Sequence, residues 1–275
     1  MLKADLHCHS TCSDGTVTPQ ELVVLAKERG LSCLSITDHD SIASYPKALP
    51  RAIELGIRLL PGVEFSTSYA GASVHVLAYA YPPESQILQT LCDWHRDRRI
   101  RRFRAILIRL QEQGIYLQES EIQQSPESIG RPHIAQALIE KGVVSSIQEA
   151  FDLYLKEGRS CFVPDPGMDL EVTLQIIRSA GGLSVLAHPH LIRNAHLLKK
   201  LLDLPFDGLE CFYGLFGSHE GLRWMHIAKK KNWLITGGSD FHGAIKPDLQ
   251  LGQSWVLQEQ ILPLLQHFDH ISSAS

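Results

Sequence analysis

Two histidines separated by one residue stand near the amino terminus, at the end of a short apolar segment. The run reads Asp5-Leu6-His7-Cys8-His9-Ser10-Thr11-Cys12-Ser13-Asp14-Gly15. On a strand successive side chains point to opposite faces, so His7 and His9 would share one face while Cys8 packs behind it. Two imidazoles on one face make half of a site for a divalent metal. The alternative is a pair of ordinary surface or core histidines.

Residue types that bind metals recur where later strands are expected to end. The polar residues at these positions are His7, His9, Asp14, Asp38, His39, Glu64, His75, His188, Asp240 and His242. Each could be a turn residue, but their repetition over six elements predicts a metal site. Imidazole mixed with carboxylate suits Mn, Fe, Co or Zn, and the lack of a Cys cluster argues against structural zinc. We expect Asp38 and Asp40 to support the ligands or to shape the turn.

The elements that would position these residues alternate between strand and helix. After the first strand, apolar runs predict strands over 33–37, 58–64, 74–79, 183–187, 207–212, 233–236 and 255–256. Helices are expected from Thr18 as N-cap to Gly30, and over 41–55, 170–179, 219–231 and 259–268. This alternation favours parallel strands with chemistry at their ends. From 84 to 158 the pattern is nearly all helical, which predicts an inserted cap.

Composition narrows the class of protein. With 275 residues, a formal charge of −4 and a pI near 6.4, the chain is not expected to coat nucleic acid or to bind duplex DNA. The six cysteines show no CxxC pair and no disulfide spacing, which suits a reducing compartment. No secretory signal is recognisable, and no apolar run reaches the roughly 18 residues that span a bilayer. We therefore expect a cytoplasmic protein without a membrane partner.

Six motifs resemble one known family. They are D-L-H-C-H-S-T-C-S-D-G at 5–15, I-T-D-H-D at 36–40, P-G-V-E-F-S at 61–66, V-H-V-L-A-Y at 74–79, A-H-P at 187–189 and G-S-D-F-H at 238–242. Together they are similar to the polymerase and histidinol phosphatase (PHP) superfamily of metal-dependent phosphoesterases. The resemblance implies an α/β fold, a distorted (β/α)7-type barrel formed by 1–83 and 164–275, with 84–163 as a helical cap subdomain.

The resemblance also implies a trinuclear metal site. His7, His9, Glu64 and Asp240 would hold one metal, and Glu64 would bridge to a second metal held by His75 and His188. Asp14, His39 and His242 would hold the third. No position departs from the family pattern, which favours an active enzyme that uses metal-bound hydroxide as nucleophile. The expected cofactors are up to three divalent metals per chain, Mn²⁺ ahead of Fe²⁺ or Zn²⁺.

The helical insertion carries a narrower resemblance. Its Gly130-Arg131-Pro132-His133-Ile134-Ala135 and the run from Phe151 to Gly158 resemble the branch of 3′,5′-nucleotide bisphosphate phosphatases and the short-RNA 5′-to-3′ exonuclease RNase AM. Arg131, just before a helix expected to start at Pro132, suits an anion, although an exposed loop arginine fits equally well. Weaker candidates for substrate binding are His133, Lys156, His190 and Arg193.

Arginines crowd the segment 96–104, where Arg96, Arg98, Arg99, Arg101, Arg102 and Arg104 surround most of the expected helix. A solvated face is the favoured interpretation, and a track for an RNA backbone is the alternative.

Four functions are compatible with these sequence features. The leading one is hydrolysis of nucleoside 3′,5′-bisphosphates, with 5′-to-3′ degradation of short RNA as a related activity. A second is histidinol phosphate phosphatase. The helical cap argues against it, because a larger, doubly phosphorylated substrate explains a cap with its own arginine better. An amidohydrolase is a third, although the segment 207–212 lacks the additional His that such a site draws from a late strand. A metal-dependent binding module is the non-enzyme alternative.

Overall fold

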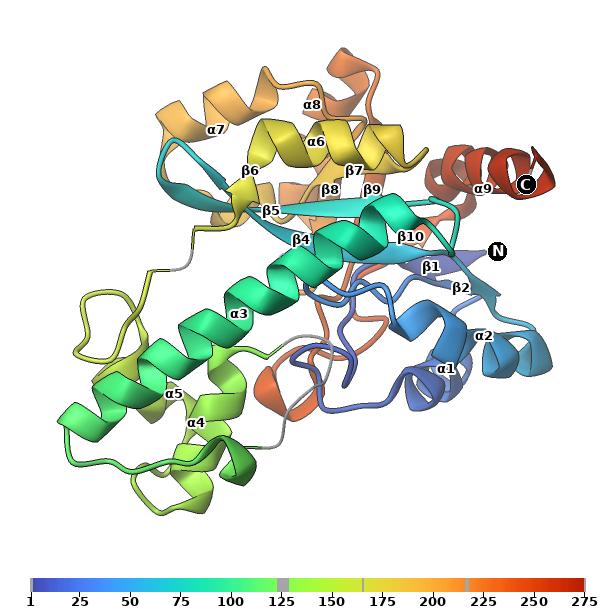
Figure 1. The fold of residues 1–275 in the computed structure, drawn as a ribbon. Coiled ribbons are helices and arrows are strands. Elements are labelled where there is room, and N and C mark those ends of the chain that lie inside the picture. The colour runs from blue at the N-terminus through green and yellow to red at the C-terminus, as the bar shows by residue number, and fades with distance from the viewer. Residues whose placement is uncertain (1, 123–128, 165, 216–217, 275) are drawn as a thin grey trace.

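The computed structural model describes residues 2–122, 129–164, 166–215 and 218–274 (Figure 1). Within these residues the chain has a mixed α/β fold with two sheets, in strand orders β10-β1-β2-β3 and β6-β4-β5-β7-β8-β9. The strands are β1 Lys3–Asp5, β2 Cys33–Leu34, β3 Arg58–Leu59, β4 Gly62–Tyr69, β5 Ala72–Tyr79, β6 Met168–Asp169, β7 Leu183–Leu186, β8 Gly208–Tyr213, β9 Leu234–Gly238 and β10 Val256–Leu257. The predicted α/β class is confirmed.

Helices flank both sheets and form the cap. The α-helices are α1 Pro19–Glu28, α2 Ser44–Leu55, α3 Gln86–Glu112, α4 Arg131–Glu140, α5 Ile147–Ala150, α6 Leu170–Ser179, α7 Ala195–Leu202, α8 Ser218–Lys231 and α9 Gln258–Ala274. Shorter helical turns lie at Glu119–Glu121, Phe151–Leu155, Pro189–Leu191 and Gly243–Ile245. Residues 123–128 of the expected helical block lie outside the described residues.

The first helix begins and ends where its sequence signals predict. The side chain of Thr18 accepts a hydrogen bond from the backbone N–H of Glu21, and the Glu21 carboxylate accepts one from the N–H of Thr18. Pro19 occupies the first turn, where its missing N–H costs no hydrogen bond. Gly30 follows the helix with φ 71°, a conformation in which glycine carries no steric penalty.

The expectation that the alternation favours parallel strands is wrong for the middle of the larger sheet and for the pair of β1 and β10. β4 and β5 form an antiparallel hairpin, and β5 also pairs with β7 antiparallel. The hairpin turns at Ala70 and Gly71, both with positive φ, which is the backbone that a two-residue turn requires for strands with a right-handed twist. The predicted strand 58–64 is also broken, since β3 ends before Pro61 and β4 begins after it.

The two sheets meet near the ends of their strands. Isolated parallel bridges join Cys8 to Phe241, just beyond β1 and β9, and His39 to Glu64, between the loop after β2 and β4. Candidate ligands lie in or beside both bridges, so the junction between the sheets also assembles the site. The distorted barrel stays a prediction.

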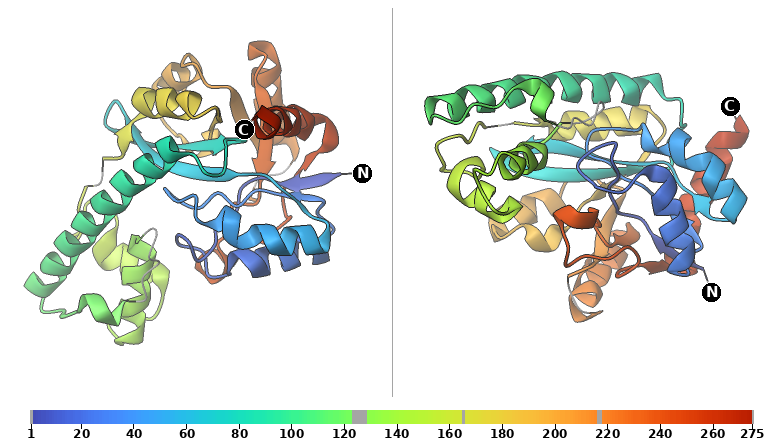
Figure 2. Two further views of the ribbon diagram at one scale, coloured as in Figure 1. Left: turned by 45° about the vertical axis from the view of Figure 1, so that its right-hand side comes forward. Right: turned by 90° about the horizontal axis from the view of Figure 1, so that it is seen from below.

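The cap has a hydrophobic core of its own. Buried apolar residues from Phe103 to Cys161 form one cluster, whereas Leu88, Leu91 and Cys92 in the first half of α3 pack in the core of the larger sheet. In Figures 1 and 2, α3 leaves the sheet and reaches α4 and α5 at its far end. This long helix therefore belongs to both cores. The exact division at 83/84 and 163/164 stays a prediction.

Candidate metal centre

Nine predicted ligands converge from both sheets. His7 and His9 follow β1, His39 follows β2, Glu64 lies in β4 and His75 in β5. His188 follows β7, while Asp240 and His242 follow β9, and Asp14 lies in the loop before α1. Six of the nine follow the end of a strand, whereas Glu64 and His75 lie within strands and Asp14 lies in a loop. Short segments at or within the strands, together with the loop that carries Asp14, thus bring all nine candidate ligands together.

Glu64 lies at the centre of this set and is buried. Its Oε2 atom lies 3.3 Å from His7 Nε2, 3.2 Å from His9 Nε2 and 3.1 Å from His39 Nδ1. Its Oε1 atom lies 2.9 Å from both His75 Nδ1 and His188 Nε2. One carboxylate thus faces two separate groups of imidazoles, the arrangement of a carboxylate that bridges two metals.

His7, His9 and Asp240 form a compact group beside Glu64. Oδ1 of Asp240 lies 3.4 Å from His7 Nε2 and 3.3 Å from His9 Nε2. Donors held about 2.1 Å from one tetrahedral metal would stand roughly 3.4 Å apart, so these separations fit a shared ion. His7 Nε2, His9 Nε2 and His39 Nδ1 are also buried without a well-formed hydrogen bond. Such orphaned nitrogens suit metal ligation.

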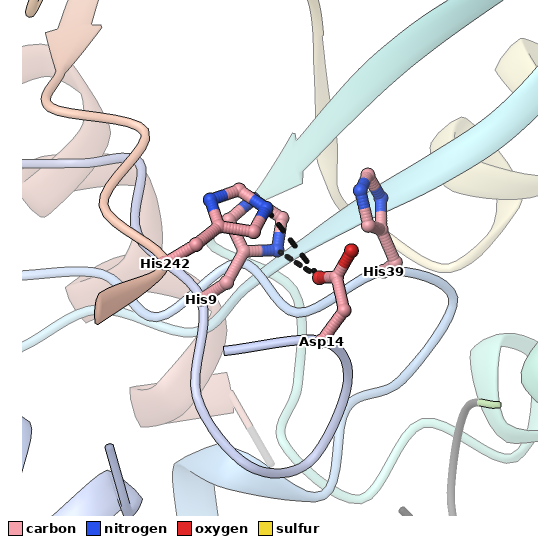
Figure 3. A group of neighbouring side chains, drawn as sticks. All are labelled: His9, Asp14, His39 and His242. Carbon is pink, nitrogen blue, oxygen red and sulfur yellow. Dashed lines mark ion pairs between the residues drawn. The ribbon is translucent and has the colours of Figure 1, made fainter. Parts of the chain in front are cut away.

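A second group surrounds Asp14, shown in Figure 3. Oδ1 of Asp14 lies 3.4 Å from His242 Nε2 and 3.7 Å from His9 Nδ1, and His39 completes a group of four potential ligands. A further group joins His39, Glu64 and His75. His9 and His39 therefore each belong to two of these groups. The family resemblance, in contrast, assigns each of them to a single metal.

Glu210 supports the centre from behind, and the sequence analysis did not include it. Its Oε1 atom lies 2.7 Å from Nδ1 of His7, and its Oε2 atom accepts a 2.6 Å hydrogen bond from the backbone N–H of His188. Its side chain is fully buried in β8. The carboxylate of Glu210 within the otherwise apolar strand 208–213 was the available signal, because a buried charge requires a partner.

Two other aspartates organise the loops around the ligands. Asp38 accepts hydrogen bonds from the backbone N–H and hydroxyl of Ser10 and from the hydroxyl of Ser13, so it shapes the loop that carries Asp14. Asp5 accepts from the backbone N–H groups of Ser239 and Gly252. Burial raises the pKa of Asp5 to about 6, against these hydrogen bonds. Both carboxylates hold backbone rather than facing the cluster.

Asp240 is held on the side away from the imidazoles. Its Oδ2 atom accepts a 2.7 Å hydrogen bond from the Tyr213 hydroxyl and lies 2.6 Å from Lys246 Nζ. Asp240 has φ 54° and His188 has φ 26°, both in the left-handed region that non-glycine residues rarely adopt. Backbone strain of this kind persists where surrounding contacts fix the conformation, as the contacts of Asp240 do.

Burial and neighbouring charged groups together set the pKa values of the histidines in the cluster. Burial alone would lower the pKa of His9, but Asp240 and Glu64 outweigh burial and raise it to about 9. His7 behaves in the same way, with its pKa raised well above the usual range by Glu210, Glu64 and Asp240 against burial. Burial lowers the pKa of His39 to about 3, and burial with the nearby His9 lowers that of His242 to about 4.

The prediction that the arginines of 96–104 form a solvated face is wrong for Arg98 and Arg99. Asp40 is fully buried, and its Oδ2 atom accepts hydrogen bonds of 2.7 and 2.5 Å from Arg99 and a longer one of 3.4 Å from Arg98. Arg99 also donates to the Ser66 hydroxyl, while Asp40 accepts from the Ser66 N–H. The helix turns these arginines toward β4, so a buried network joins α3 to the ligand-bearing strand.

A cavity of about 420 Å³ opens over the ligands, and we call it the metal cavity. Asp14, His39, His75 and His242 line it. The cations among its described lining residues are Arg99, Arg102, Arg131 and Lys246. Positive charge beside a cluster of metal ligands suits a substrate with several phosphate oxygens.

The predicted substrate-binding residues are placed differently from one another. Arg131 lines the metal cavity, donates to the Leu155 carbonyl and lies over the rings of Phe151 and Phe162. Lys156 pairs with Asp152 on the surface of the cap and does not line that cavity.

His133, His190 and Arg193 lie in three different surroundings. His133 Nδ1 accepts a hydrogen bond from the Gly130 N–H at the start of α4. The His190 ring packs against Tyr213, 4.4 Å between centroids, and Arg193 lines a separate cavity beside His75 and His188. Their substrate roles stay predictions.

The fold and this convergence of histidines and carboxylates define an α/β protein with clusters of side chains that are able to hold metal ions. The chain belongs to the PHP domain family, whose model matches residues 5–160. The predicted family is confirmed, and with it a metal-dependent phosphoesterase fold.

Relatives of established name are similar over most of the chain. A 5′-3′ exoribonuclease of Haemophilus influenzae is 31% identical over 274 residues, covering 97% of this chain and 99% of the relative. A 3′,5′-nucleoside bisphosphate phosphatase of Chromobacterium violaceum is 31% identical over 250 residues, 88% of each chain. A solved structure from Bifidobacterium adolescentis, assigned as a metal-dependent phosphoesterase, superposes with a TM-score of 0.86 at 31% identity and 96% coverage of each chain. Both named relatives are hydrolases of phosphoester bonds.

Among the described residues, no helix is long and apolar enough to cross a membrane. The cytoplasmic location stays a prediction.

Proposed function

We propose that this protein is a metal-dependent hydrolase of nucleoside 3′,5′-bisphosphates, which it converts to 5′-monophosphates, and that it also removes nucleotides from the 5′ end of short RNA. The observation that carries the proposal is the convergence of the candidate ligands, four of which (Asp14, His39, His75 and His242) line a cavity that also contains four cations. Relatives named for these two activities, each about as similar to this chain as the other, support both substrates.

The donor set fits divalent metals. His7, His9, Glu64 and Asp240 would hold one metal, Glu64 with His75 and His188 a second, and Asp14 with His39 and His242 a third. We propose Mn²⁺ in these positions, with Fe²⁺ or Zn²⁺ as alternatives that suit the same donors. When bound, such metals supply Lewis acidity and activate water for attack on phosphorus.

The remaining residues orient the ligands and the substrate. Glu210 fixes the ring of His7, and Tyr213 with Lys246 fixes the carboxylate of Asp240. Arg99, Arg102 and Arg131 enter the cavity from the cap, where they would position the phosphate that is not hydrolysed. Arg99 and Lys246 also pair with Asp40 and Asp240, and Glu157 lines the same cavity, but two phosphates would use more of the four cations than one phosphate would, which favours a bisphosphate over histidinol phosphate.

The test is a turnover screen of purified, Mn²⁺-loaded protein. Its substrates are adenosine 3′,5′-bisphosphate, AMP, histidinol phosphate and a 5′-phosphorylated oligoribonucleotide, with phosphate or mononucleotide release as readout. We expect the bisphosphate and the oligoribonucleotide to be hydrolysed fastest, and exhaustive chelation to abolish both activities. Full activity after chelation, or preference for histidinol phosphate, would contradict the proposal.

Asp240→Ala separates an enzyme from a metal-dependent binding module. A hydrolase loses turnover, because one donor of the ligand group with His7 and His9 is gone. A binding module would retain affinity for its partner as long as the fold survived. Circular dichroism of the variant controls for folding.

A further inference from the structure

A second cavity of about 420 Å³ lies next to the metal cavity, and we call it the α4 cavity. Asp14 and Pro132 line both cavities, so the two adjoin at a candidate metal ligand. One wall is the face of α4, and the opposite wall comes from the loops after β1 and β9, where Ile245 contributes an apolar surface. The cavity therefore lies between the cap and the sheets, within reach of a molecule held at the metal centre.

The side chains of α4 that form this wall all lie on one face of the helix. His133, Gln136, Ala137 and Glu140 are spaced by three, four and seven residues, so they lie on one side of the helix. The opposite side of α4 carries Ile134 and Leu138, which are buried in the core of the cap. This helix thus packs the cap with one side and lines the cavity with the other, and Ala137, which is also buried in the cap core, lies at the boundary between the two.

The two cavities differ sharply in charge. The metal cavity carries Arg99, Arg102, Arg131 and Lys246, whereas the α4 cavity has no Arg or Lys among its described lining residues. Each cavity is lined by two carboxylates, Asp14 and Glu157 in the metal cavity and Asp14 and Glu140 in the α4 cavity, so the cations alone make the difference. Phosphate is therefore favoured in the metal cavity and disfavoured in the α4 cavity.

We infer that the α4 cavity binds the nucleobase of the substrate, and that Gln136 and Glu140 make it select bases with an exocyclic amino group. This inference rests on the proposed function, since it assumes a nucleotide whose phosphates occupy the metal cavity. Pro132, Ala137, Ala244 and Ile245 give the cavity apolar surface, and its volume is that of an ordinary ligand pocket. A flat, uncharged base fits such a place.

Selection follows from the hydrogen-bonding groups on α4. Gln136 Nε2 lies 3.1 Å from Oε1 of Glu140, so the amide and the carboxylate form one polar pair at the exposed end of the wall. A carboxylate only accepts hydrogen bonds, and adenine, cytosine and guanine offer an amino group to it. Hypoxanthine presents a carbonyl oxygen at the position of the adenine amino group, which a carboxylate repels. Adenosine should therefore bind better than inosine.

The aromatic rings of the metal cavity are the competing place for a base. Phe151 and Phe162 could stack on one, but the Arg131 guanidinium already lies 5.2 and 5.9 Å from their ring centroids. Stacking there would require Arg131 to leave both rings. The α4 cavity needs no such rearrangement.

The experiment compares three substrates that share the same phosphates: adenosine 3′,5′-bisphosphate, inosine 3′,5′-bisphosphate and 1-deoxyribose 3,5-bisphosphate, which has no base. We expect kcat/KM to fall about tenfold from adenosine to inosine and further without a base, mainly through KM. Glu140→Gln should remove the preference for adenosine over inosine. Ala137→Phe, which fills the cavity, should lower kcat/KM for adenosine to the value of the base-free substrate and leave the latter unchanged.

Matched variants identify the cause of each change. Glu112→Gln removes an exposed carboxylate at the end of α3, away from both cavities, and should leave all three substrates unaffected. The inference is overturned if Ala137→Phe slows the three substrates equally or not at all. It is also overturned if Phe162→Leu, rather than Ala137→Phe, removes the effect of the base.

A binding measurement keeps the inference separate from the proposed function. Ligand-observed NMR with adenosine and inosine, which carry no phosphate, tests the α4 cavity without turnover. If the wild type hydrolyses none of the bisphosphates but binds adenosine, and Ala137→Phe abolishes that binding, the proposed function fails and the base site stands. If the bisphosphates are hydrolysed but Ala137→Phe leaves adenosine binding intact, the base site fails alone.

Discussion

The Nδ1 atom of His7 lies 2.7 Å from Oε1 of Glu210, while Nε2 of the same ring faces Glu64 and Asp240 at 3.3 and 3.4 Å. The ring is thus held on one edge by a fully buried carboxylate and presents its other edge to the cluster. A carboxylate in this position fixes both the orientation and the tautomer of a histidine that binds metal through Nε2.

Glu210→Gln should therefore weaken metal binding without removing a ligand. The glutamine keeps the shape of the side chain but lowers the basicity of His7, so we expect affinity for Mn²⁺ to fall about tenfold to a hundredfold. Competition with a chelator of known affinity measures the change. Asp207→Asn is the matched control: this acidic residue just before β8 binds the backbone and hydroxyl of Ser184 and should leave metal affinity unchanged. Equal affinity in wild type and Glu210→Gln would contradict the role assigned to Glu210.

The buried pair of Asp40 and Arg99 should stabilise the protein independently of metal. Asparagine tolerates the φ of 55° at position 40, so Asp40→Asn removes the charge with little change in backbone preference. We expect the free energy of unfolding to fall by about 3 kcal/mol, because Arg98 and Arg99 lose their buried counterion. Urea denaturation of the chelated protein measures it.

An exposed pair on the same helix provides the control. Asp93 and Arg96 are 3.0 Å apart with both side chains more than 40% exposed. Asp93→Asn should change the free energy of unfolding by less than about 1 kcal/mol, since solvent screens such pairs. If the two variants have the same stability, the network between α3 and β4 does not hold the cap.

That the candidate metal ligands lie close together could be predicted from the sequence, because most of them follow strands that local signals mark. An apolar run followed by His or Asp marks a strand end, and the helix from Thr18 to Gly30 is delimited by its own capping residues. Whether two strands pair in parallel or antiparallel depends less on local sequence signals. The turn at Ala70 and Gly71 makes β4 and β5 antiparallel, and the alternation of strand and helix around it pointed to the opposite arrangement.

The supporting residues could not be assigned because their roles depend on what lies across from them. Glu210 supports His7 only because β8 places it behind the ring of a residue 203 positions away. The six arginines of 96–104 occupy most of the helix circumference, so nothing in their spacing says which of them turn inward. The buried Asp40 decides this, and its partners on α3 are distant in sequence.

The chelated protein should lose stability as pH rises above neutrality. The pKa of His9 is raised from 6.5 to about 9, so its protonated form contributes stability that is complete below pH 6.5 and is lost as pH rises through about 9. His7 acts in the same direction. The protons on the two Nε2 atoms face Glu64 and Asp240, where a metal ion would otherwise balance these carboxylates, and their loss leaves the carboxylates unbalanced.

Bound metal should remove this loss of stability at alkaline pH, because the metal supplies the positive charge that the protonated histidines supply in its absence. Urea denaturation of chelated and Mn²⁺-loaded protein over the same pH range measures the difference. On the acid side the sign reverses: the pKa values of His39 and His242 are lowered to about 3 and 4, so their contribution is present above 6.5 and lost as pH falls toward those values. Parallel pH profiles with and without metal would contradict the substitution of protons for metal.

Lys246 should act on the substrate as well as on Asp240. Its Nζ atom lies 2.6 Å from Asp240 Oδ2, yet its side chain is 39% exposed and lines the metal cavity. Lys246→Met keeps the length of the chain but removes the charge, and we expect KM for adenosine 3′,5′-bisphosphate to rise about tenfold, since the cation faces the expected phosphates. Tyr213→Phe removes the other donor to the same oxygen without a change in charge, and we expect it to leave KM within about twofold. If both variants reduce kcat equally and leave KM alone, Lys246 only holds Asp240 in place.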